Sequence, residues 1–244
     1  MSSKLLVMLA MAFVHFLTFA QSTVDHSRFD GVLKQHVVDG VVDYAAIKKD
    51  KRFAEYLKAL SGVNPSSIKN KKERLAFWIN AYNAFTIELI LRNEPVKSIR
   101  DIKQDEAGPW DIVWIEIGGA RYSLNHIEHE IIRKEFDEPR IHVALVCAAK
   151  SCPPLRSEAY DGQRLEAQLD DNGALFLFDK TKNRFAKETN TLYLSELFKW
   201  FSNDFVTTYG SAELYAARVL GLGATKPVAV KYLPYDWSLN GKQE

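Results

Sequence analysis

The sequence lacks an excess of charge of either sign. Its 32 Lys and Arg residues against 31 Asp and Glu residues leave a formal net charge of +1. A charge this small provides no electrostatic attraction for a polyanion. We therefore expect no nucleic-acid partner and no polyanionic substrate.

Long hydrophobic runs are missing after residue 20, so we expect no membrane span in the rest of the chain. The one long apolar run follows Lys4 and covers residues 5–20. It is shorter than the roughly 20 residues that a membrane-spanning helix needs, and small residues at Thr18 and Ala20 fit a signal peptidase site. Residues 1–20 are predicted to be a cleaved signal peptide, with an uncleaved membrane anchor as the alternative. The mature protein would then be exported, either periplasmic or secreted.

Low-complexity tracts, internal repeats and linker-like stretches are also missing. The remaining residues, 21–244, are long enough for one hydrophobic core, and an aromatic content of 12% is typical of a packed domain. We therefore predict a single globular domain over residues 21–244. The aromatic residues expected in its core, rather than on a sugar-binding surface, are Trp110, Trp114, Tyr122 and Trp200.

The hydrophobic periodicity predicts an α+β fold, a helix-rich single domain around a small, mostly antiparallel sheet. Residues 73–92 form the strongest predicted helix, which is apolar nearly all round and should be buried at the centre. Gly118-Gly119 predicts a hairpin turn, and Asn125 with Glu128 predicts a capping box at the start of a helix. The other predicted helices are 26–37, 43–60, 125–136, 165–178, 195–205 and 211–220, and the predicted strands are 112–117, 120–124, 141–147, 183–187, 191–194 and an edge strand within 228–239.

Both cysteines lie in one short stretch, residues 140–156, which reads RIHVALVCAAKSCPPLR. The apolar, β-branched run 141–147 predicts a buried strand. Pro153-Pro154 can continue neither a sheet ladder nor a helix, so Cys152 is expected on a loop at the end of that strand. Loops on a rigid scaffold are common positions for reactive groups.

One hypothesis for this stretch is a thiol enzyme. A cysteine nucleophile needs a base that holds it as the thiolate and a third group that orients the base. His129 is freer than His142 to approach Cys152, because His142 begins the same predicted strand. The reaction would be that of a hydrolase or acyl transferase on an unidentified small-molecule or peptide substrate, without a cofactor. The candidate nucleophile, bases and orienting groups are, in that order, Cys152, His129 and His142, and Glu128 and Asn80.

The competing hypothesis is a structural disulfide in a non-catalytic cell-envelope binding or scaffold domain. Export implies an oxidising compartment, and Cys147 and Cys152 can be bridged if their loop turns. Closing so small a loop contributes about 1–2 kcal/mol in the loop-closure model. The C-x4-C spacing also lacks the two-residue gap that is typical of dithiol oxidoreductases.

A zinc site is a third alternative. His126 shares a helix face with Glu130 and nearly does so with His129, and either Cys152 or His142 would complete a tetrahedral set. The spacing H-x-x-H-E is not the zincin motif H-E-x-x-H. We therefore predict no metal site.

Asn80 and Asn83 are polar residues inside the most apolar helix. Buried asparagine must be hydrogen-bonded, so each is expected to bind the backbone of a neighbouring loop, with the loop of Cys152 as one candidate. The alternative is that one of them lines a cleft as an oxyanion donor or as a group that orients the base.

A set of linked motifs resembles the domain-of-unknown-function family 547. These motifs extend over roughly residues 29–240, and such linked motifs rarely match by chance. The resemblance implies no established biochemical role, and family members occur both exported and within larger intracellular proteins. It favours His129 over His126 as the functional imidazole. The matching motifs are Asp43-Tyr44, FWINAYNA at 77–84, SLNHIEH at 123–129 with Arg133, RIHVAL at 140–145, Cys147, SCPPLR at 151–156 and YDWSLN at 235–240.

Overall fold

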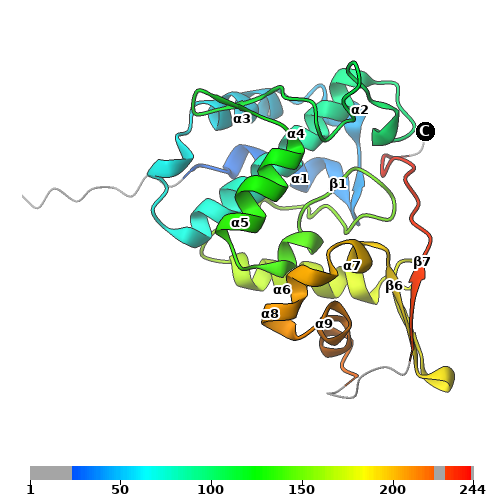
Figure 1. Cartoon of the computed structure of the whole chain (residues 1–244). Coiled ribbons are helices and arrows are strands. Elements are labelled where there is room, and N and C mark those ends of the chain that lie inside the picture. Colours follow the sequence, from blue (N-terminus) through cyan, green and yellow to red (C-terminus); the bar gives the residue numbers. More distant parts are fainter. Residues whose placement is uncertain (1–23, 223–228, 243–244) are drawn as a thin grey trace, which may run out of the picture.

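The computed structural model describes residues 24–222 and 229–242, and Figure 1 shows how their helices and strands are arranged. The predicted signal peptide, residues 1–20, lies outside the described residues. Within the described ranges, no helix combines the length and the apolar character needed to cross a membrane.

Helix α4 (Lys71–Asn93) passes through the centre of the fold (Figure 1). Every residue from Leu75 to Leu91 is buried except Glu88. The prediction of a central buried helix is therefore confirmed, and its cause is the apolar surface on all sides of the helix. The Asn70 side chain begins the helix by accepting hydrogen bonds from the amides of its second and third residues.

The remaining elements confirm an α+β class in which helices dominate. The predicted turn at Gly118-Gly119 is present, and both glycines have positive φ angles, 59° and 80°. Strand β7 pairs in parallel with β6 at one edge of a three-stranded sheet, whereas the other strand pairs are antiparallel. The helices are α1 (Ser27–His36), α2 (Tyr44–Ile47), α3 (Lys51–Ser61), α5 (Arg133–Glu135), α6 (Leu165–Phe178), α7 (Leu197–Trp200), α8 (Val206–Tyr209) and α9 (Ala212–Val219). The strands are β1 (Val37–Val38), β2 (Val41–Val42), β3 (Ile115–Ile117), β4 (Ala120–Tyr122), β5 (Arg184–Ala186), β6 (Thr191–Ser195) and β7 (Ala229–Leu233).

Two predicted helices are each divided in the structure. The segment 43–60 forms α2 and α3, because the Asp50 carboxylate accepts the amide of Arg52 and caps a new helix. The segment 195–205 forms α7 and then a 3₁₀ turn (Ser202–Phe205), which leads into α8. The division falls at Phe201, whose φ and ψ angles of −110° and 20° lie outside the helical range.

The predicted strand 141–147 is wrong. Residues Pro139–Val143 form a 3₁₀ helix, and irregular backbone follows as far as Cys147. The backbone finds its partners in side chains instead of a sheet ladder. Asn83 on α4 donates to the carbonyl of Ala144 and accepts the amide of Val146, both at 2.9 Å.

Removing the Asn83 side chain is expected to lower the free energy of unfolding by about 2 kcal/mol, because Asn83→Ala leaves a buried carbonyl and a buried amide unpaired. Urea denaturation measures the change. The control is Asn93→Ala at the exposed end of the same helix, where the side chain bonds only the Leu89 carbonyl. That control should change stability by less than about 0.5 kcal/mol. Equal losses in the two variants would contradict the expectation.

Among the described residues, the buried side chains form two hydrophobic clusters. The larger surrounds α4, and the second lies among α6, α7, α9 and strand β6. Val143 belongs to the second cluster and its neighbour Ala144 to the first. The segment that carries His142 and Cys147 therefore runs along the boundary between the two clusters.

Candidate active site

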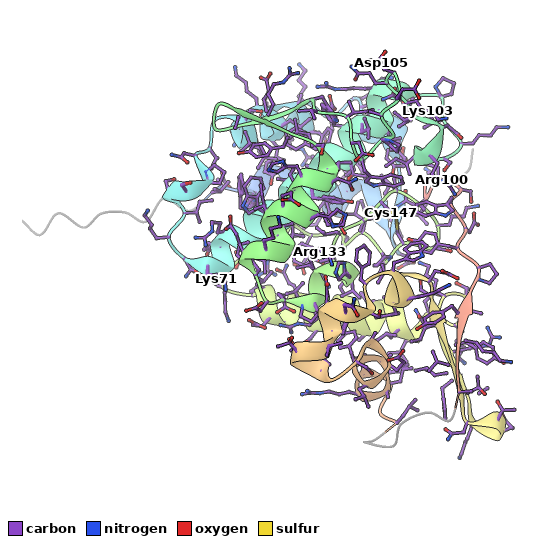
Figure 2. All side chains as sticks on the ribbon, in the orientation of Figure 1. Lys71, Arg100, Lys103, Asp105, Arg133 and Cys147 are labelled. Carbon is purple, nitrogen blue, oxygen red and sulfur yellow. A yellow bond between two sulfur atoms is a disulfide. The ribbon has the colours of Figure 1, made fainter. Side chains whose placement is uncertain are left out.

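A cavity of about 200 Å³ opens at this boundary. Figure 2 shows the side chains between α4 and the α7–α9 segment, where Cys147 and Arg133 are labelled. Aromatic rings dominate the walls, and a few polar groups lie among them. The residues that line the cavity are Tyr82, Trp110, Asn125, Glu128, His129, His142, Leu145, Cys147, Pro153, Leu197, Trp200, Phe201, Tyr235 and Trp237.

The helix predicted over 125–136 is present, but it begins as a π-helix, His126–Ile132, and continues into α5. The predicted capping box is wrong. Asn125 makes no capping bond, and its amide instead donates to Asp111 at 2.6 Å. The Ser123 hydroxyl, and not the Asn125 side chain, accepts the amide of His126. The Glu128 side chain takes no part in this capping bond and lines the cavity instead.

The π-helix places two successive polar residues in the cavity wall. The amide of Arg133 donates to the carbonyl of Glu128, five residues earlier, so this turn contains one residue more than an α-helical turn. Glu128 and His129 both line the cavity. Wide turns of this kind are frequent at functional sites.

Glu128 is a buried carboxyl group whose side chain is 10% exposed. Burial raises its pKa to about 7, although a hydrogen bond with Tyr82 and the positive charge of Arg133 act in the opposite direction. The negative charge of Asp204 adds to the increase. The carboxyl of Glu128 therefore changes its protonation state near neutral pH, which suits a general acid or base.

His142 lies between two carboxylates. Its Nε2 is 2.7 Å from Asp204 Oδ2, and its Nδ1 is 3.9 Å from Glu128 Oε1. The imidazole also stacks on Phe201, with ring centroids 3.8 Å apart. Because burial lowers the pKa of His142 despite the bond to Asp204, the ring is neutral at pH 7. An ionised carboxylate only accepts, so Nε2–H donates to Asp204 and the lone pair of Nδ1 faces Glu128.

Arg133 joins His129 to the same network. Its guanidinium donates to both oxygens of Asp204 at 2.7 Å, and Nη1 lies 3.0 Å from His129 Nδ1. Burial opposes ionisation of Asp204, but the bonds from His142 and Arg133 outweigh it and hold the pKa of Asp204 well below its usual range. Burial and the charge of Arg133 lower the pKa of His129. Both histidines are therefore neutral groups beside a fixed negative charge.

Cys147 and Cys152 form the disulfide that the second hypothesis predicted. Cys147 lines the cavity, whereas Cys152 is 2% exposed and is not part of the cavity wall. Among the described residues, no hydrogen bond connects either sulfur to a histidine. In the bridged protein Cys152 carries no thiol, so its role as a nucleophile stays a prediction for the reduced protein.

The C-terminal segment is held against the cysteine loop by backbone hydrogen bonds. The amides of Lys150 and Ser151 donate to the carbonyls of Ser238 and Asp236 at 2.8 and 3.1 Å. This pairing brings Tyr235 and Trp237 to the cavity, and it brings the Tyr235 hydroxyl to the disulfide. Both residues belong to the motif YDWSLN at 235–240, which is part of the family resemblance. This motif was the sequence signal that could have indicated their position at the site.

Asn80 and Asn83 both bind loop backbone, as expected. Asn80 bonds the carbonyl and the amide of Tyr160 at 2.8 and 2.9 Å, and it does not line the cavity. Asn83 holds the segment that leads into Cys147 rather than the loop of Cys152. The structure therefore does not bring Asn80 to either histidine.

The zinc alternative is not assembled in the structure. Across the described part of the chain, no group of three or more His, Cys, Asp or Glu residues is placed to hold a metal ion. His126 packs edge-on against Tyr122, Glu130 pairs with Lys134, and Cys152 is in the disulfide.

The sequence prediction placed one cavity residue, Trp200, incorrectly and missed Asp204. Trp110, Trp114 and Tyr122 pack against the larger hydrophobic cluster as expected, and Trp110 also lines the cavity. Trp200 was expected in the core, but it is exposed and lines the cavity, where it stacks on Trp237 with centroids 5.8 Å apart. Asp204 lies 62 residues after His142 on a short 3₁₀ turn. No motif or periodicity around it indicated its role.

The fold is a helix-rich α+β domain, and its candidate site is a cavity lined by aromatic side chains, Glu128 and two histidines. Residues 65–177 match the model of the family described as "Protein of unknown function, DUF547". This match confirms the resemblance that the motifs predicted, over a shorter range than the motifs themselves cover. The matched range contains Glu128, His142 and both cysteines, whereas Asp204 lies beyond it. No curated protein and no solved structure matches the chain.

Proposed function

We propose that the cavity is the catalytic centre of an exported hydrolase that uses Glu128 and the His142–Asp204 pair as its acid and base. The observation that carries this proposal is the 3.9 Å separation between Glu128 Oε1 and His142 Nδ1, two largely buried side chains that both line the cavity. One group titrates near neutral pH, and the other is a neutral imidazole held by an ionised carboxylate. Paired titratable groups in different surroundings are typical of acid–base catalysis.

The proposed step is the attack of water on a hydrolysable bond. His142 Nδ1 accepts a proton from the water, and Asp204 stabilises the imidazolium that forms. Protonated Glu128 donates its proton to the leaving group. The step adds one proton to His142 and removes one proton from Glu128. Transfer of a proton from His142 to Glu128 then restores the starting protonation states.

The wall of the cavity restricts the class of substrate. Among the described residues that line it, none is Lys or Arg, and Arg133 is already paired with Asp204. An anionic substrate would therefore meet no unpaired cation there. The aromatic rings suit an uncharged or cationic ester, amide or glycoside. The N-terminal pattern of residues 1–20 supports an exported location.

A thiol-dependent hydrolase or acyl transferase is the second candidate, restricted to the reduced protein. Cys147 supports it, because that cysteine shares the cavity with His142 and His129. The pair first predicted, Cys152 with His129, requires both cleavage of the bridge and exposure of a buried sulfur. A non-catalytic binding or scaffold domain is the third candidate, and the disulfide supports it.

The test is a screen of chromogenic esters, amides and glycosides without reductant, with wild type beside Glu128→Gln. Glu130→Gln is the matched control, because Glu130 lies on the same helix and is exposed. Turnover by wild type and control, but not by Glu128→Gln, supports the proposal. Activity that needs reductant and disappears in Cys147→Ser supports the thiol candidate instead. Ligand binding without turnover in every variant would favour a binding domain.

A further inference from the structure

The two sulfur atoms of the disulfide have different surroundings. Cys147 is only partly buried, and it forms part of the cavity wall. Cys152 is 2% exposed and lies behind that wall. A small molecule that enters the cavity therefore meets Cys147 and not Cys152.

The buried sulfur accepts two hydrogen bonds. The backbone amide of Cys147 donates to Cys152 Sγ at 3.1 Å, and the Tyr235 hydroxyl donates to the same sulfur at 3.3 Å. That hydroxyl also lies 3.4 Å from Cys147 Sγ, so the Cys147 amide is the donor that distinguishes the two sulfurs. Burial raises the pKa of Tyr235, so this hydroxyl keeps its proton and remains a donor. Hydrogen bonds strengthen when the acceptor becomes charged. The two donors therefore stabilise a Cys152 thiolate more than they stabilise the neutral disulfide.

These surroundings match the requirements of thiol–disulfide exchange. The attacked sulfur must be accessible, and the sulfur that leaves must be a stable thiolate. Cys147 meets the first requirement and Cys152 the second. A purely structural bridge needs neither an opening beside one sulfur nor donors directed at the other.

We propose that Cys147–Cys152 is a redox-active disulfide that exchanges with small uncharged or cationic thiols entering the cavity. The sulfur of an incoming thiolate, whose proton has passed to solvent, attacks Cys147 Sγ and forms a new S–S bond. The bond between Cys147 and Cys152 breaks, and its electron pair remains on Cys152, held by Tyr235 and the Cys147 amide. A second thiol then displaces Cys147 from the mixed disulfide. Two thiols are thereby oxidised to a small disulfide, and the two cysteines are reduced and take up two protons.

The charge preference follows from the cavity itself. No Lys or Arg side chain lines it in the described part of the chain, whereas Glu128 does. Asp204 bonds the cavity residue His142 from outside the wall and is paired with Arg133, so Glu128 is the carboxyl group that an entering thiol meets. An anionic thiol carries a second negative charge into these surroundings. This inference is independent of the hydrolase proposal, because it requires only the cavity and the bridge.

The experiment exposes the oxidised, folded protein to three thiols of similar size: cysteamine, 2-mercaptoethanol and mercaptoacetate. Each reaction is quenched with iodoacetamide and examined by peptide mapping, and each rate is divided by that thiol's rate with a small-molecule disulfide. We expect the mixed disulfide on Cys147 and the alkyl group on Cys152. Cysteamine and 2-mercaptoethanol should react at least about tenfold faster than mercaptoacetate. A tenfold difference in rate corresponds to about 1.4 kcal/mol of repulsion between the carboxylate of mercaptoacetate and the cavity.

A variant tests the thiolate donor. Tyr235→Phe should slow the reduction about tenfold through loss of one hydrogen bond to a charged sulfur, whereas Tyr193→Phe, on strand β6, should not change it. If Tyr235→Phe does not fold, mapping of the wild type still decides the matter. A mixed disulfide on Cys152, equal normalised rates for the three thiols, or no reduction before denaturant is added would each overturn the proposal. None of these assays contains a hydrolysable substrate, so hydrolysis can fail while exchange succeeds.

Discussion

The Glu128→Gln variant is expected to turn over a substrate identified in the screen about 10²- to 10⁴-fold more slowly than wild type, the usual contribution of a positioned acid or base. Glutamine keeps the size of the side chain but has no proton to donate to a leaving group. The measurement is kcat/KM for both proteins across a pH series. Glu130→Gln should retain the wild-type value, because its side chain is exposed and pairs with Lys134.

The pH dependence provides an independent check of the assignment. The active form has Glu128 protonated and His142 neutral. Wild-type kcat/KM should therefore fall as the pH rises through about 7, and it should fall again at acidic pH, below the ordinary His142 pKa of 6.5. The residual activity of Glu128→Gln should lack the alkaline limb. An unchanged alkaline limb in that variant would assign it to another group and contradict the role of Glu128.

The second large effect of Glu128→Gln concerns stability. The substitution is expected to raise the stability of the protein, whereas it lowers the activity. The pKa of Glu128 is about 7 in the folded protein against an ordinary value of 4.5, so the folded state binds the proton more tightly than the unfolded chain. Stability therefore falls as the pH rises from 4.5 to about 7, and the full loss persists above that range. The difference corresponds to about 3 kcal/mol. The side chain is almost fully buried, so solvent screens little of this effect.

Glutamine at position 128 does not titrate and avoids this loss. At about pH 9, Glu128→Gln should be more stable than wild type by up to about 3 kcal/mol, and at about pH 4 the two proteins should be nearly equal. Urea denaturation at both pH values measures the difference. Glu130→Gln should show no such gain at high pH. A gain of the same size at both pH values would mean that burial does not shift the Glu128 pKa.

Together, the two results would separate function from folding at one residue. A substitution that stabilises the protein and abolishes activity is typical of a site where activity depends on an unfavourable buried group. A purely structural Glu128 would instead contribute to stability at neutral pH, and its removal would lower it.

Elements with a local signal could be predicted from the sequence. Helix α4 follows from an apolar surface on all sides, and the β3–β4 turn follows from two adjacent glycines. The bounds of α6 also agree with the helix predicted over residues 165–178. In each case the free energy that selects the structure comes from neighbouring residues or from burial of the whole segment.

Other segments could not be predicted, because their backbone groups bond to residues far away in the chain. The apolar run 141–147 has the composition of a strand, but the Asn83 side chain, more than 60 residues earlier, binds its backbone. The composition of residues 141–147 gives no indication of these bonds. The same holds for the π-helix at Glu128, whose wider turn no pattern in its sequence indicated.

For the site, the sequence determined which reactive side chains were available, and the fold decided which of them act together. Glu128, His129, His142 and the two cysteines were all identified from their types and motifs. Their partnership depends on Asp204 and Tyr235, which approach from distant segments. The pKa of Glu128 likewise depends on burial and on charges outside its own helix. These quantities exist only once the chain has folded, because they are set by distances through space and not by positions along the sequence.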